Sequence, residues 1–133
     1  MLSGRASTLL APALIASLLF TSVAAAEPSE VDRNRARKLM MDGDALAQAS
    51  DHAGALPSYE AADAIMNVPT TGLAVARTQA ALGKLVEARD KAIRVSRSAP
   101  QAGEPAVFQT AREEAGQLAA ALEPRIPSLR VLI

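Results

Sequence analysis

Two stretches of the chain, residues 47–65 and 81–95, match each other at an offset of about 33 residues, a spacing within the range of known structural repeats. Each copy reads as a helix, a tight turn and a second helix, and each is followed by a proline, Pro69 or Pro100. The aligned pairs are Gly43 with Ala76, Ser50 with Gly83, Asp51 with Lys84, His52 with Leu85, and Ala55 with Ala88. A duplicated helix pair restricts the fold, because one such unit cannot bury its own apolar face and must pack on the next.

The composition favours helices that approach one another closely. Alanine is abundant, whereas aromatic residues make up 2% of the chain. Beyond residue 26 the only aromatic side chains are Tyr59 and Phe108. Because alanine favours helix and β-sheets prefer β-branched and aromatic residues, we expect an all-α fold.

Residues 1–26 have the three parts of a secretory signal peptide. Arg5 supplies the charged start, an apolar stretch of about 15 residues follows, and three alanines precede Glu27. We expect cleavage between Ala26 and Glu27 and a periplasmic or secreted location. The alternative is an uncleaved anchor, which the length disfavours because a spanning helix needs about 20 residues. The chain has no cysteine, which excludes both lipid attachment through cysteine and disulfides.

Capping and breaking residues predict five helices after the leader. Ser29 is the expected N-cap of the first, with Asp32 in its first turn. Pro57 is tolerated if the second helix begins near Ala55, which places the proline in the first turn. Gly83 is a natural left-handed residue after the third helix. The expected ranges are 30–49, 55–66, 70–82, 85–97 and 105–122.

The C-terminal segment, 124–133, differs from the helical region at 27–123. Two prolines end the last helix, and the alternating sequence that follows reads like a first strand. A lone strand is not stable in water. The tail is therefore expected either to pack on the helices or to begin a further module.

The repeated unit resembles the tetratricopeptide repeat, whose period is about 34 residues. The residues that carry the resemblance are Leu39, Gly43, Leu46, Ala55, Tyr59 and Ala62 in the first copy, and Val75, Ala76, Ala88 and Val95 in the second. Asp42 departs from the pattern. The resemblance implies a short right-handed stack of antiparallel helix pairs, about 2.5 repeats. The chain also resembles exported bacterial repeat proteins in which a few such helices are followed by a small β-domain of the PEGA type. An unrelated alanine-rich helical bundle is the alternative.

In the tetratricopeptide family the first helix of each unit lines a concave groove that binds a peptide or a partner helix. The resemblance therefore implies a partner-binding surface. It would contain Arg37, Met40, Asp44 and Gln48 from the first unit, and Thr70, Leu73 and Arg77 from the second. The competing interpretation is that these side chains are merely solvated or packed.

The sequence contains no recognisable catalytic, cofactor or metal motif. His52 is the one histidine, the chain lacks cysteine, and its glycines are isolated. Glu113 and Glu114 are neighbours on a helix and point in different directions. We therefore predict no enzyme, cofactor or metal site, although a convergent polar pocket would reopen the enzyme or small-molecule class.

Charge and length narrow the class of partner. Removing Arg5 with the leader leaves 13 of the 14 basic residues against 14 acidic ones, which disfavours nucleic-acid binding. No stable membrane insertion is expected after cleavage. The expected function is an exported scaffold for protein–protein interaction. The alternative is a structural spacer or the N-terminal stub of a larger envelope protein. A homodimer is also expected to be feasible, since pairing would hide an open end of the stack.

Overall fold

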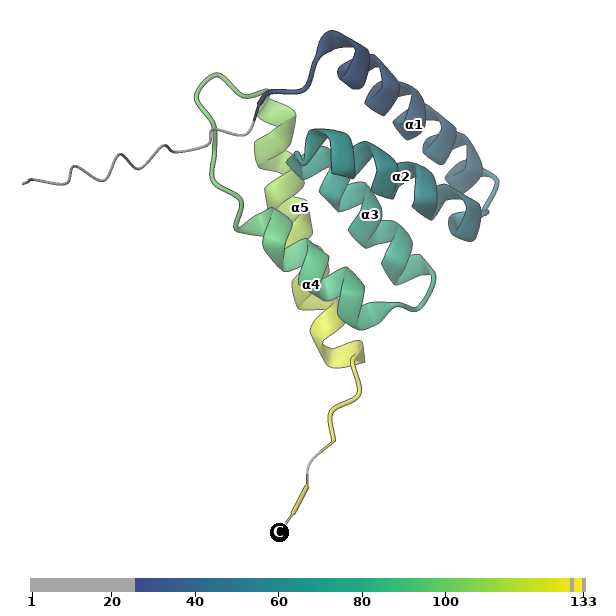
Figure 1. Cartoon of the computed structure of the whole chain (residues 1–133). Helices are drawn as coiled ribbons and strands as arrows, with labels where there is room; N and C mark the ends of the chain where they lie inside the picture. Colours follow the sequence, from purple (N-terminus) through teal and green to yellow (C-terminus); the bar gives the residue numbers. More distant parts are fainter. Residues whose placement is uncertain (1–25, 130, 133) are drawn as a thin grey trace, which may run out of the picture.

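The computed structural model describes residues 26–129, 131 and 132, which form five α-helices packed against one another and one short 3-10 helix (Figure 1). The elements are α1 (Glu30–Gln48), α2 (His52–Met66), α3 (Pro69–Ala81), α4 (Leu85–Ser96), α5 (Ala106–Leu122) and η1 (Glu123–Arg125). Among the residues described there is no strand. The all-α prediction is confirmed for this part of the chain. The predicted signal peptide lies almost wholly outside it.

The start of α1 follows the capping residues that the sequence predicts. The Ser29 hydroxyl accepts the amide of Asp32 at 3.1 Å, and the Asp32 carboxylate accepts the amide of Ser29 at 3.3 Å. This reciprocal pair is a capping box, which satisfies two amides that the helix itself cannot. The first helix therefore begins where predicted.

The predicted start of α2 is wrong. The helix begins at His52, not near Ala55, and Pro57 lies inside it rather than in its first turn. The reason is the N-cap Asp51, whose side chain accepts the amide of Gly54 at 2.8 Å and fixes an earlier start. Pro57 cannot donate to the carbonyl of Ala53, but Ala53 is exposed, so water can bond that carbonyl.

The two turns that precede α2 and α4 have the same backbone geometry at equivalent positions of the repeat. Ser50 and Gly83 both have positive φ, 62° and 77°. The next residues, Asp51 and Lys84, also agree, with φ/ψ of −87°/72° and −79°/66°. The offset found in the sequence is thus repeated in the backbone of two successive helix pairs. The first turn adopts this geometry at Ser50 even though serine is less favourable than glycine at positive φ.

Small residues allow the helices of each pair to approach closely. Gly43 of α1 faces the Tyr59 ring of α2, and a Cβ added to Gly43 would lie 2.7 Å from the ring. Gly72 of α3 faces Val95 of α4, where an added Cβ would lie 2.5 Å from a methyl group. Around these crossings the core is mostly alanine, with Ala55, Ala62, Ala76, Ala88, Ala92 and Ala115 fully buried.

A buried polar cluster joins the first helix pair to the second. Asp63 of α2 accepts the Thr71 hydroxyl at 2.7 Å and forms an ion pair with Lys91. Thr71 lies at the start of α3 and Lys91 lies on α4. One carboxylate therefore connects three helices, and its pairing is needed because an unpaired buried charge is strongly destabilising.

The C-terminal tail forms no strand among its described residues, so the strand prediction is wrong for them. Nor do its described residues beyond Ser128 pack on the helices. Leu129, Val131 and Leu132 are 92%, 72% and 89% exposed, and the tail runs away from the helical body (Figure 1). The described part of the chain offers no neighbouring strand whose amides and carbonyls could pair with this segment.

We predict that Gly43→Ala lowers the free energy of unfolding by about 1 kcal/mol or more, because overpacking against Tyr59 outweighs the gain in helix propensity. Gly116→Ala on α5 is the matched control. Its new methyl group would meet only Ser96, at 3.8 Å, so it should stabilise by about 0.5–1 kcal/mol. Urea unfolding measures both, and an equally stabilising Gly43→Ala would contradict the close crossing.

Candidate functional site

Three helices, α1, α3 and α5, together line a groove on one face of the protein. It consists of three adjoining pockets of about 530, 310 and 250 Å³. Met40, Thr70 and Val107 line both of the larger pockets, while Asp44, Ala74 and Arg77 line both of the smaller ones. Because neighbouring pockets share these walls, we treat them as one surface, the α1/α3/α5 groove.

The groove changes character along its length. The largest pocket is mainly apolar, with Met40, Val107 and Phe108 in its walls and Arg33 and Arg37 beside them. The smallest pocket is also mostly apolar in area, but it holds more hydrogen-bonding side chains and forms the more polar end of the groove; it is lined by Asp44, Ala47, His52, Tyr59, Ala74, Arg77 and Thr78. A ligand that follows the groove would therefore meet apolar contacts first and hydrogen-bonding groups at the other end.

Six of the seven predicted partner-binding residues lie in the walls of this groove. They are Arg37, Met40 and Asp44 on α1, and Thr70, Leu73 and Arg77 on α3. The seventh, Gln48, is the exposed last residue of α1 and lines none of the three pockets. Its neighbour Ala47 lines the smallest pocket instead. Whether these residues bind a partner stays a prediction.

Helix α5 forms a wall that the sequence analysis did not predict. Val107, Thr110 and Glu114 face the groove, and they are spaced by three and four residues. This spacing is visible in the sequence as a second stripe beside the buried one at Ala111 and Ala115. Nothing in the sequence marks this stripe as part of a binding surface, because the repeat that underlies the resemblance does not extend to α5.

The polar end of the groove gathers titratable side chains, but they are largely bonded to one another. Tyr59 donates to Asp44 at 2.7 Å, and Arg77 pairs with Glu114 at 2.8 Å. Burial, followed by the hydrogen bond to Asp44 and its charge, raises the pKa of Tyr59 to about 12. The phenol donates to Asp44, which lines the groove, and the same burial and bond disfavour its ionised form.

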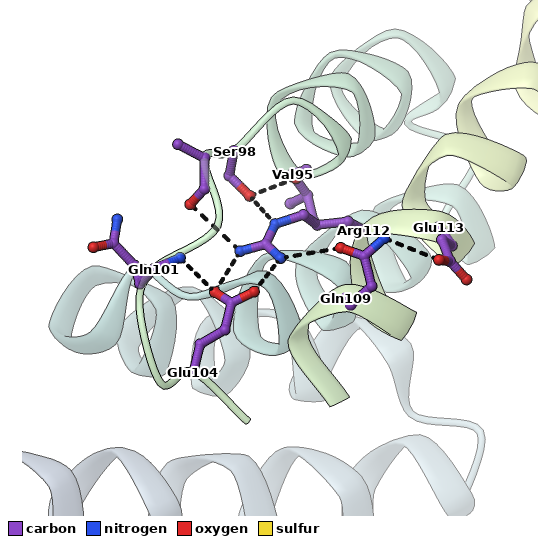
Figure 2. Close-up of polar contacts among 8 residues, drawn as sticks. Val95, Ser98, Gln101, Glu104, Gln109, Arg112 and Glu113 are labelled. Carbon is purple, nitrogen blue, oxygen red and sulfur yellow. Dashed lines mark hydrogen bonds and ion pairs between the residues drawn. The ribbon is translucent and has the colours of Figure 1, made fainter. Parts of the chain in front are cut away.

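A second polar cluster holds the start of α5 in place (Figure 2). Arg112, only 6% exposed, pairs with Glu104 through two short bonds of 2.5 and 2.7 Å. Its Nε also donates to the Ser98 hydroxyl at 3.1 Å. These bonds tie α5 to the loop at residues 97–105, which leads into the helix. They therefore fix the first turn, where Val107 and Phe108 line the groove.

Other kinds of site are not evident in the part of the chain that the structure describes. It contains no group of three or more histidine, cysteine, aspartate or glutamate residues arranged to hold a metal ion. His52, which precedes the helix predicted at 55–66, is instead the first residue of α2 and lines the smallest pocket. No described helix is both long enough and apolar enough to cross a membrane.

Comparisons with known proteins leave the groove as the main guide to function. No protein-family model, no curated protein and no solved structure matches this chain.

We predict that the Glu104–Arg112 pair makes stability fall in acid. The Arg112 guanidinium, helped by the Gln101 amide, lowers the pKa of Glu104 from 4.5 to about 2. A carboxyl group whose pKa is lower in the folded state than in the unfolded chain stabilises the fold fully at any pH above its pKa in the unfolded chain. That contribution is lost as the pH falls from about 4.5 to about 2. Urea unfolding across this range should show a shallower decline for Glu104→Gln than for the wild type, and parallel curves would contradict the assignment.

Proposed function

We propose that this protein is a short helical-repeat scaffold that binds a segment of another protein chain in the α1/α3/α5 groove. The observation that carries the proposal is the groove itself, whose walls come from the first helix of each successive pair and from α5. The resemblance to the tetratricopeptide repeat implies a partner-binding surface on these same faces of α1 and α3. The pockets extend across three helices, which suits a segment with several side chains.

The repeated geometry supports a tetratricopeptide-like arrangement. Helices α1 and α3 end at Gln48 and Ala81, and α2 and α4 begin at His52 and Leu85, so both boundaries keep the offset of the sequence match. Aligned positions at the crossings are buried in both pairs, as Ala55 and Ala88 show with no exposed surface. Stacking of successive units is what creates an extended concave surface in repeat proteins.

The chemistry of the groove favours a protein segment over a small molecule. Several of its polar groups already bond to one another, such as Tyr59 to Asp44 and Arg77 to Glu114. Its largest pocket is mainly apolar. Apolar anchors from a partner would bury there, with affinity coming mainly from the area removed from water.

The place of action that we propose is outside the cytoplasm. The support comes from residues 1–26, whose charged start, apolar stretch and alanines before Glu27 have the pattern of a secretory signal peptide. Mass measurement of the protein recovered after export tests this directly. A protein that retains Met1 in a secreting host would contradict it.

We predict that Val107→Asp strongly weakens groove binding without unfolding the protein. Val107 is 53% exposed and is the second residue of α5, where an acidic side chain suits the helix N-terminus. Peptides selected by display on the wild type should bind the variant at least ten-fold more weakly, because a carboxylate would sit between the two larger pockets.

Val86→Asp is a closely matched control. Val86 is also the second residue of its helix, α4, has a similar exposure of 47% and lies outside the three pockets. Its affinity for the selected peptides should stay within two-fold of the wild type. If both variants lose the same affinity for the peptides, or if Val107→Asp loses none, the peptides bind elsewhere. If display yields no binding peptide, the proposal also fails.

A further inference from the structure

The tail beyond η1 exposes an unusual amount of apolar surface. Leu129, Val131 and Leu132 each expose more than two thirds of their surface, and none of them contacts the helical core. Leaving such side chains in water forgoes about 25 cal/mol for each Å² that could be buried. Three of them within four residues indicate a segment that is covered in a complex.

The same chain carries a surface of matching character. The apolar end of the α1/α3/α5 groove has a volume of about 530 Å³ and includes Met40, Val107 and Phe108. Val107 is itself 53% exposed there. An extended segment with closely spaced aliphatic side chains could therefore place them in this end of the groove and bury both surfaces together.

The tail of the same copy cannot place all three of its apolar side chains at this end of the groove. From Phe108 to Leu122 the helix rises about 21 Å, and η1 adds about 6 Å in the same direction. The segment from Ile126 to Leu132 spans at most about 25 Å when fully extended. Even if the tail turned straight back along α5, only Leu132 would come level with Phe108, and Leu129 would fall about 10 Å further short. A tail from another molecule has no such restriction.

We propose that the apolar tail, meaning the segment that carries Leu129, Val131 and Leu132, binds in the α1/α3/α5 groove of a second copy of this chain. This inference rests on the proposed function, because it names the occupant of the same groove. If two copies each bind the tail of the other, they form a closed dimer. If each copy binds the tail of the next, they form an open assembly of several molecules.

The charges of the groove indicate how this association should respond to salt. Arg77 is paired with Glu114 and Arg33 with Glu30. Arg37 and Asp44 bond only to neutral groups, Asn34 and Tyr59, but the aliphatic side chains of Leu129, Val131 and Leu132 carry no charge that could pair with them. Contact between the tail and the groove is then mainly apolar. The dissociation constant should change less than three-fold between low and high NaCl concentration, unlike that of a contact held by surface ion pairs.

The test mixes two variants purified after expression of the whole chain and follows their association by sedimentation velocity. One variant, Val107→Asp, has a damaged groove and an intact tail. The other, with Leu129, Val131 and Leu132 all changed to Asp, has an intact groove and a damaged tail. Each alone should associate at least ten-fold more weakly than the wild type. Their mixture should recover a complex, since each supplies what the other lacks.

Several outcomes would overturn the inference. They are a wild type that stays monomeric up to hundreds of micromolar, a mixture that does not associate, and tail-dependent association that Val107→Asp leaves intact. The last would mean that tails bind one another or another face. Val86→Asp should associate as the wild type does, and circular dichroism checks that each variant is folded.

The same preparations separate failure of this inference from failure of the proposed function. If a display-selected peptide still binds the wild type and loses affinity with Val107→Asp, the groove is a binding site and only its occupant is misassigned. If neither the tail nor a selected peptide depends on Val107, the groove itself is not a binding site.

Discussion

The carboxylate of Asp63 fixes the position of the second helix pair against the first, and the groove depends on that position. Asp63 is only 9% exposed, and its oxygens are used by Thr71 on α3 and Lys91 on α4. Gly72 lies beside this cluster and lets Val95 of α4 come close. Breaking the buried pair on one side would leave a charge uncompensated, which typically costs about 3–5 kcal/mol.

Three further polar contacts hold the elements that form the walls of the groove. Tyr59 holds Asp44 on α1, Glu114 on α5 holds Arg77 on α3, and the Glu104–Arg112 pair fixes the first turn of α5. Each contact joins two different elements, and alanine at the crossings keeps those elements close. The chain therefore uses little apolar volume to shape its surface, which suits a core with so few large side chains.

Local signals in the sequence predict much of this fold, and long-range contacts account for most of what they miss. The Ser29 cap and the turn at Gly83 follow from a few neighbouring residues, and both are found. The predicted start of α2 is wrong because two local signals compete there, and the Asp51 cap prevails over Pro57. The Lys91–Asp63 pair joins residues 28 positions apart, and no local pattern marks them as partners. The α1 and α3 walls include six residues that the resemblance to the tetratricopeptide repeat implies, whereas the α5 wall lies beyond the part of the chain that carries the resemblance.

The most direct test of the groove is to map a bound peptide by NMR. Amide chemical shifts of the ¹⁵N-labelled protein would be followed as a display-selected peptide is added. If the groove is the binding site, the largest changes will cluster around Met40 on α1, Thr70 on α3 and Val107 on α5. Changes concentrated instead on exposed positions of α2 and α4, such as Glu60 and Arg94, would place the binding surface on the opposite helices and contradict the proposed function.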